Sequence, residues 1–173
     1  VYCALLGTGD AWESLRKLSS ELGLDAYVWF PGYVSLAELR SYLATADVLA
    51  APDPKNSFTD RSTMIKLMEY MAMEKPIVAF DLTVHSVSAG ESVLYARPNE
   101  TLDFARQIAA LMDDAALRGR MGSFGRQRVE SHLAWEHQKG HLLEAYAKLG
   151  LVPGNAGKRA GRQLSSASHA TLS

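Results

Sequence analysis

The residues whose types and spacing could do chemistry are concentrated in positions 50–81, which read APDPKNSFTDRSTMIKLMEYMAMEKPIVAFD. A helix predicted over 62–74 places Ser62, Lys66 and Glu69 at i, i+4 and i+7, within about 60° of one another on one stripe. The apolar residues of the same helix share a different face and are predicted to be core: Met64, Leu67, Met68, Met71 and Ala72. The helix therefore has one buried face and one polar face.

The polar stripe suits a ligand that carries both an anion and hydroxyl groups. A loop rich in turn formers precedes the helix, and Asp60 or Ser62 could cap its first turn. The remaining free N–H groups would attract an anion such as phosphate, whereas the Glu69 carboxylate, further along, would suit a ribose diol. The alternative is an ordinary Lys66–Glu69 surface pair worth about 0.2–0.5 kcal/mol. Helical geometry alone does not choose between these two interpretations.

The string EYMAMEKPIVA, beginning at Glu69, resembles the EAMACGKPVIA stretch of the group 1 glycosyltransferases. These are retaining nucleotide-sugar enzymes built from two Rossmann-like domains. In that family a first Glu stands eight residues before the second, and here Arg61 occupies its position, next to Asp60. A subset of the family carries a DxSTMxKxxEYMA pattern, which the segment starting at Asp60 fits. The resemblance therefore points to the donor-binding domain, with the first Glu replaced.

The resemblance implies roles for residues around this helix. Glu69 would bind the ribose of the donor. The helix start, with Ser62, Thr63 and Met64, would stabilise the leaving diphosphate together with Lys66, and Arg61 could assist. Asp60 belongs to the same donor-binding segment. No metal is expected, and the substrate is a nucleoside-diphosphate sugar.

Two further segments resemble donor-contacting parts of the family. The turn GTGD after the first apolar run contains Gly9, which would approach the donor, although a plain strand-to-helix turn explains the glycines as well. The phrase FPGYVSLAELRSYLATADVLAAP resembles a family segment whose backbone meets the nucleobase. It implicates Tyr33 and Val34 through their main-chain groups, and Tyr33 could equally be a packing residue.

The order of elements predicts an α/β protein with a doubly wound, Rossmann-like parallel sheet. The resemblance implies that this sheet is one half of a two-domain glycosyltransferase architecture. Strands are expected at 1–6, 27–30, 47–51, 76–80 and 93–96, with helices at 11–22, 35–44, 62–74, 101–113 and 133–149. Segment 81–91 is expected to be a loop, with a solvated His85. Ligands of such sheets bind outside the carboxyl ends of the strands, where loops 7–10, 31–34, 53–61 and 81–91 meet.

Composition and charge set further limits. The chain has 173 residues, 47% of them hydrophobic, which suffices for one domain over 1–154, and the basic, Ser-rich stretch 155–173 is predicted to be a disordered tail. A net charge of −1 argues against nucleic acid as a partner. The single cysteine, Cys3, lies in a strand predicted to be fully buried and is expected to fill the core. No run is long enough to span a membrane, so a cytoplasmic protein is expected, with peripheral membrane association possible at full length.

Four arginines between 115 and 132 could form a face for an anionic membrane or a partner, but a solvated helix is the preferred interpretation: Arg118, Arg120, Arg126 and Arg128. His85 has no Cys, His or carboxylate companion at metal-ligand spacing, so no metal site is expected there.

The predicted function is transfer of a sugar from a nucleoside diphosphate to a carbohydrate or lipid-linked acceptor. The chain begins inside an apolar run without Met, so we expect an N-terminal acceptor-binding domain in a longer protein and no activity without it. One alternative is a nucleotide-sugar epimerase of related architecture. Another is a non-catalytic nucleotide-sugar sensor or subunit, which the missing first Glu makes possible. A receiver-like domain fits the fold but lacks paired acids after the first strand.

Overall fold

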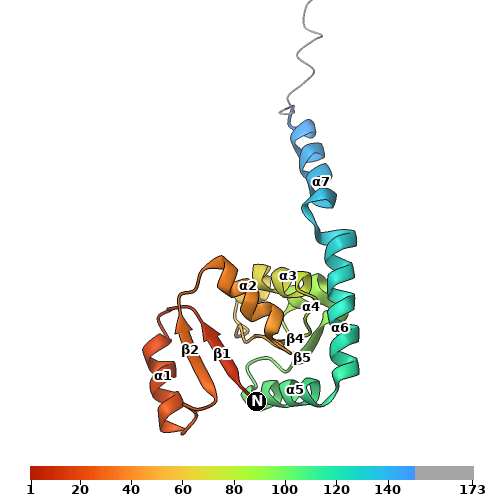
Figure 1. Cartoon of the computed structure of the whole chain (residues 1–173). Helices are drawn as coiled ribbons and strands as arrows, with labels where there is room; N and C mark the ends of the chain where they lie inside the picture. Colours follow the sequence, from red (N-terminus) through yellow and green to blue (C-terminus); the bar gives the residue numbers. More distant parts are fainter. Residues whose placement is uncertain (151–173) are drawn as a thin grey trace, which may run out of the picture. The chain divides into compact units, whose positions relative to one another are not determined.

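The structure, a computed structural model, describes residues 1–150, and the predicted tail 155–173 lies outside the described residues. The chain divides into two compact units, 1–133 and 134–173. Figure 1 labels the α-helices and most of the strands. The elements of the first unit run as follows: β1 (Cys3–Leu6), α1 (Trp12–Glu21), β2 (Val28–Gly32), α2 (Leu36–Thr45), β3 (Leu49–Ala51), η1 (Thr59–Arg61), α3 (Ile65–Ala72), β4 (Ile77–Phe80), α4 (Thr83–Ala89), η2 (Gly90–Ser92), β5 (Val93–Ala96), α5 (Thr101–Asp113), α6 (Ala115–Arg128) and the π-helix η3 (Val129–Leu133). The second unit, as far as it is described, consists of α7 (Trp135–Lys148).

All five predicted strands are present, and every pairing among them is parallel. This confirms the α/β class with helices between parallel strands. The hydrogen-bonded strands form two groups, with the orders β1–β2 and β3–β4–β5. The short β3 has three residues, and β4 is its partner.

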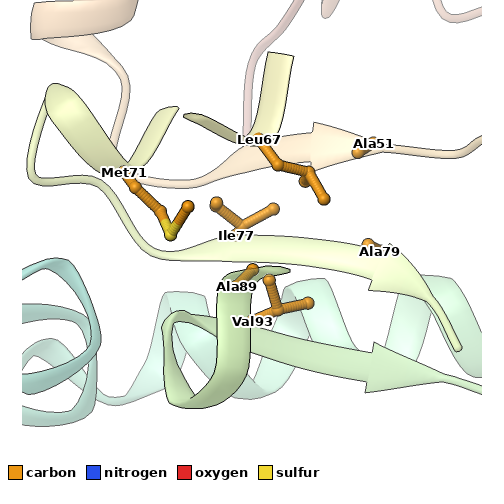
Figure 2. Packing of buried hydrophobic residues seen from close by; sticks show 7 residues of the cluster. All are labelled: Ala51, Leu67, Met71, Ile77, Ala79, Ala89 and Val93. Carbon is orange, nitrogen blue, oxygen red and sulfur yellow. The ribbon is translucent and has the colours of Figure 1, made fainter. Parts of the chain in front are cut away.

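Helices cover both faces of the β3–β4–β5 sheet, and the side chains of β4 alternate between them. Ile77 and Ala79 point into a cluster with Leu67 and Met71 of α3, which Figure 2 shows together with residues of β3, β5 and the end of α4. On the other face, Val78 and Phe80 pack against residues of α5 and α6. All four residues of β4 are buried, as expected for a central parallel strand with helices on both sides.

The β1–β2 sheet is less well covered. Trp29 of β2 lies 5.6 Å from the ring of Tyr42 in α2, and Phe30 lies 5.5 Å from Trp12 in α1, so adjacent residues of β2 face different helices. In contrast, the first three residues of β1 are exposed, Cys3 among them. The predictions of a fully buried first strand and of Cys3 as core filling were wrong, because β2 is the single described strand that pairs with β1.

Segment 81–91 is not a loop. It contains α4 and the short η2, and His85 is fully buried, so the expectation of a solvated histidine was also wrong. The helix starts at Thr83, where Asp60 of η1 accepts hydrogen bonds from the Thr83 backbone N–H (2.9 Å) and hydroxyl (3.2 Å). The cap of α4 thus comes from a residue 23 positions earlier, which local sequence could not reveal.

The arginines of α6 hold the ends of three other helices. Arg118 donates to the carbonyls of Leu111 and Met112 at the end of α5, at 2.7 and 2.8 Å. Arg126 donates to the last carbonyl of α3 at 2.6 Å, and Arg128 donates to two carbonyls near the end of α4, both at 2.8 Å. Guanidinium groups favour this position because helix C-termini present free carbonyls and partial negative charge. The prediction of a solvated helix therefore failed for Arg118 and Arg128, which are half-buried, whereas Arg126 is exposed.

None of the helices within residues 1–150 combines the length and the apolar composition needed to cross a membrane.

Candidate functional site

The candidate site is the loop 52–64 and the first turn of α3, where the chain leaves the carboxyl end of β3. Short-range hydrogen bonds shape this loop: the Asn56 side chain accepts from the backbone N–H groups of Phe58 and Thr59, at 2.9 and 3.0 Å. Asn99, which follows β5, binds Lys55 twice, accepting from its N–H at 2.7 Å and donating to its carbonyl at 3.2 Å. Asn99 itself has φ +62, a conformation that Asn tolerates better than most residues. The loop 52–64, which follows β3, is therefore also anchored to the segment that follows β5.

The helix of the site begins at Ile65, three residues later than the sequence predicted. Ser62 and Met64 are extended, at φ −102 and −84, and the Ser62 hydroxyl donates to the Phe58 carbonyl at 2.8 Å. The polar stripe on α3 is therefore Lys66 and Glu69, without Ser62. In the described chain, no hydrogen bond takes up the N–H of Ile65 or Lys66, and Met64 provides no side-chain cap. The start of α3 is free to bind an acceptor.

Neither predicted cap serves α3. Asp60 caps α4 instead, and Lys55 lies 3.5 Å from its carboxylate. The backbone hydrogen bond from Thr83 is the main cause that lowers the pKa of Asp60 from its ordinary value of 3.8. Asp60 is thus an ionised carboxylate that joins η1 to α4.

The Lys66 ammonium binds Asp53, at 2.7 Å from Oδ1, and not Glu69. This rules out the interpretation of Lys66 and Glu69 as an ordinary surface pair. Glu69 is exposed, and none of the hydrogen bonds or ion pairs of residues 1–150 involves its carboxylate. Asp53 is half-buried two residues beyond β3. It was missed although its position after a strand end was a usable signal.

His85 lies buried close to this ion pair. Its Nδ1 lies 3.1 Å from the carbonyl oxygen of Phe80. Because a carbonyl oxygen can only accept a hydrogen bond, Nδ1 carries the proton and Nε2 carries a lone pair. Burial lowers the pKa of His85, while the Phe80 carbonyl and Asp53 act in the opposite direction. His85 is therefore a neutral imidazole at neutral pH.

Tyr70, the residue after Glu69, also has a shifted pKa. Burial is the main cause that raises the pKa of Tyr70, and the negative charges of Asp53 and Glu69 add to it.

Of the other predicted residues, Gly9, Tyr33 and Val34 follow the ends of β1 and β2, and Arg61 lies in the loop itself. Gly9 follows β1 with open space around its Cα, whereas Gly7 has φ +120 and is the glycine that the turn requires. Tyr33 and Val34 follow β2, and the Tyr33 side chain is 85% exposed. Arg61 is exposed at the end of η1. Among the described residues no hydrogen bond or ion pair joins Gly9, Tyr33 or Val34 to the loop 52–64.

A cavity of about 390 Å³ lies beside the loop, on the side of the sheet that α5 covers. Its walls are mostly apolar: Pro52, Pro54, Phe80, Asn99, Thr101 and Phe104. The described residues contain no group of three or more His, Cys, Asp or Glu side chains that could hold a metal ion.

The chain belongs to the glycosyl transferases group 1 family, whose model matches residues 1–114. It is 32% identical over 140 residues to the D-inositol 3-phosphate glycosyltransferase of Nocardia farcinica, covering 78% of this chain and 29% of that protein. It is 29% identical over 140 residues to the GDP-mannose-dependent alpha-(1-6)-phosphatidylinositol monomannoside mannosyltransferase of Mycobacterium tuberculosis, covering 76% of this chain and 35% of that protein. The chain thus spans about a third of the length of these relatives.

Solved structures share its fold. The sucrose-phosphate synthase of Thermosynechococcus elongatus matches with a TM-score of 0.74 at 23% identity, over 85% of this chain and 38% of that one. Anabaena HepE in complex with UDP matches with 0.67 at 20% identity, over 86% and 41%. The C-terminal domain of a group 1 family protein (LpcC) from Francisella tularensis matches with 0.62 at 14% identity, over 78% and 86%. The last match corresponds in extent to a single domain of such a protein.

Proposed function

We propose that this chain is the donor-binding part of a retaining glycosyltransferase that moves a sugar from a nucleoside diphosphate to a carbohydrate or lipid-linked acceptor. The observation that carries the proposal is the pair of side chains on α3. Lys66 is held at the start of the helix by Asp53, and the exposed Glu69 carboxylate follows one turn later without a described partner. A cation for a diphosphate and an acceptor for a ribose diol therefore stand at helical neighbour spacing.

In this proposal the free N–H groups of Ile65 and Lys66 and the Lys66 ammonium stabilise the negative charge that develops on the leaving diphosphate. Such preorganised groups supply stabilisation without reorganising during the reaction. Arg61 adds a positive charge at the end of η1. The extended backbone of Ser62, Thr63 and Met64 forms the approach to the helix, and Asp60 fixes this approach against α4.

The nucleotide base would lie toward the ends of β1 and β2, next to Gly9 and the backbone of Tyr33 and Val34. The absence of a side chain at Gly9 and the open space around it support a close approach of the ligand. The named substrates and ligands of similar proteins, GDP-mannose and UDP, support a nucleoside diphosphate as the ligand class.

A second candidate is a non-catalytic nucleotide-sugar-binding subunit. The observation that favours it is Arg61, which stands where the family's first Glu is expected and exposes a cation there. A sugar-transfer assay of the complete gene product, before and after Arg61→Glu, separates the two candidates. A subunit of this kind would show no sugar transfer before the substitution, whereas an active enzyme would transfer with Arg61 in place.

Thermal unfolding of the complete gene product with UDP, GDP and ADP tests the proposal. Ligand at 100 times its dissociation constant stabilises by about 2.7 kcal/mol, a midpoint shift of roughly 5–10 °C for a domain of this size. We expect one nucleotide to produce this shift and Glu69→Ala to reduce it. A protein that none of the three nucleotides stabilises would contradict the proposal.

A further inference from the structure

One side of β1 has no partner strand among the described residues, whereas its other side pairs in parallel with β2. The N–H groups of Cys3 and Gly7 donate to carbonyls of segment 27–32, both at 2.9 Å. Because successive N–H groups of a strand point to opposite sides, those of Ala4 and Leu6 point to the unpaired side. The backbone of β1 thus offers free hydrogen-bonding groups along this side.

The unpaired side of β1 lacks the features that keep exposed strand edges from pairing. Natural edges usually carry charged residues or proline, which discourage contact with another strand. Residues 1–6 contain neither, and Cys3, Ala4 and Leu5 are exposed. In contrast, β2 contains Pro31, which is typical of an edge strand. The composition of β1 is therefore that of an interior strand of a parallel sheet.

The helix that follows β1 exposes an apolar stripe. Leu15, Leu18 and Leu22 stand at i, i+3 and i+7, within about 60° of one another at the helical period. They are 42%, 48% and 61% exposed, whereas Ser19, next to them on the helix, is buried. The described chain therefore leaves these three residues, the leucine stripe, open beside the buried side of α1.

The exposed side chains of β1 lie on the same face of the sheet as α1. Cys3 pairs with Val28, so both side chains point to one face. Phe30, two residues after Val28, lies on that face too and contacts Trp12 of α1, with ring centroids 5.5 Å apart. Leu5, two residues after Cys3, points the same way. The open part of β1 and the leucine stripe therefore belong to one uncovered surface.

We propose that this surface binds a strand and a helix that precede Val1 in the complete gene product, together called the strand–helix segment. Its strand pairs with β1 in parallel, as in every described pairing. Parallel strands need a crossover between them, usually a helix, and such crossovers are right-handed. The step from the new strand to β1 and the step from β1 to β2 run in the same direction across the sheet. Both helices therefore lie on one face, and the new helix packs beside α1 against the leucine stripe.

Two observations favour this occupant over a second copy of the chain. The β3–β4–β5 group also has an unpaired side, at β3, and Figure 1 shows β1 between β2 and that group. One parallel strand would therefore satisfy both β1 and β3, whereas a copy related by a two-fold axis would pair β1 with itself, antiparallel. The chain also spans only 29% and 35% of the two relatives named above, so a longer polypeptide can supply the segment.

Amide hydrogen exchange in the complete gene product tests the new strand. We expect the N–H groups of Ala4 and Leu6 to exchange at least about 100-fold more slowly than in an unstructured peptide, because the new strand would accept their hydrogen bonds. The N–H of Val78, in the central strand β4, is the control for a folded sheet. Slow exchange at Val78 with less than this protection at Ala4 and Leu6 would overturn the inference.

Reaction of Cys3 with N-ethylmaleimide tests the cover over the α1 face. The control is Lys17→Cys, because Lys17 points away from the leucine stripe and its side chain is 78% exposed. In the folded complete gene product we expect Cys3 to react at least about 100-fold more slowly than the introduced thiol, and in urea at a similar rate. Similar rates in the folded protein would overturn the inference. Protection of Cys3 that falls on dilution would also overturn it, because it would assign the surface to a second copy.

A matched pair of substitutions tests the leucine stripe in the complete gene product. Leu18→Gln should lower Tm by about 5 °C or more, because a polar amide would be buried against the new helix. Lys17→Gln, one position away and facing solvent, should change Tm by less than about 2 °C. Equal shifts in Tm would mean that nothing covers Leu18 and would overturn the inference. None of these measurements involves a nucleotide, so their outcome is independent of the proposed function.

Discussion

Replacing Gly122 with Ala tests how closely α6 packs against the turn that follows α3. A Cβ atom at position 122 would lie 2.3 Å from the carbonyl oxygen of Glu74 and 2.9 Å from its carbonyl carbon. The clash is with backbone, and a rotamer change cannot relieve it. The helix or the turn must therefore move by about 0.7 Å to reach even a 3.0 Å contact.

The surrounding contacts resist this movement. Glu74 has φ +57 and forms the tight end of α3, and its carboxylate accepts from the Ser123 hydroxyl at 2.8 Å. Arg126 ties the same turn through the Ala72 carbonyl at 2.6 Å. Overpacking typically costs about 1–3 kcal/mol, and weakening a charged hydrogen bond adds about 1.5 kcal/mol or more. The better helix propensity of Ala offsets about 1 kcal/mol, so we expect a net destabilisation of about 2–3 kcal/mol.

Gly119 provides the matched control, because it lies in the same helix with nothing within 4 Å of an added Cβ. Gly119→Ala should therefore stabilise by about 0.5–1 kcal/mol through helix propensity alone. Urea unfolding of the two variants and the wild type gives the comparison, since the variants differ only in where one methyl group is added. A difference of less than about 1 kcal/mol between the two variants would refute the close packing described for α6.

Three further predictions concern contacts that join distant segments. Arg118→Met should destabilise the protein by about 1–2 kcal/mol, because two carbonyls at the end of α5 lose a charged donor. Arg120 is an exposed residue of the same helix, and Arg120→Met should change the free energy of unfolding by less than about 0.5 kcal/mol. Thermal unfolding compares the two variants. Asn99→Ala should speed amide hydrogen exchange at Lys55 about tenfold by removing both anchors of the loop, and unchanged exchange would count against that anchoring role. The pKa of Asp60 is depressed in the folded state, so its stabilising contribution is present above pH 3.8 and is lost as the pH falls below that value. In urea unfolding at a series of acidic pH values, Asp60→Asn should therefore show a smaller decline of the midpoint than the wild type. A decline as steep as that of the wild type would contradict the role of Asp60 as the cap of α4.

Much of the fold was predictable because its signals are local. The five strands are short apolar runs bounded by turn residues, and their predicted positions agree with the structure to within two residues at each end. The predicted helix at 101–113 matches α5 at both ends. The capping box at Ser35, in which Ser35 and Glu38 exchange hydrogen bonds, fixed the start of α2. The interpretation of Glu69 and Lys66 as site residues remains a prediction, and the structure supports it by pairing Lys66 elsewhere.

The errors share a physical cause, which is that contacts distant in sequence decide local structure. The helix α4 forms because Asp60 caps Thr83 across the sheet edge, and its buried His85 is satisfied in part by Phe80. The sequence by itself determined the class of fold, the family and the placement of Lys66 and Glu69 on one face of α3, because periodicity and motif spacing are local properties. Only the tertiary structure decided that Asp53 is the partner of Lys66, because these residues are 13 positions apart in the sequence and come within hydrogen-bond distance only when the chain has folded.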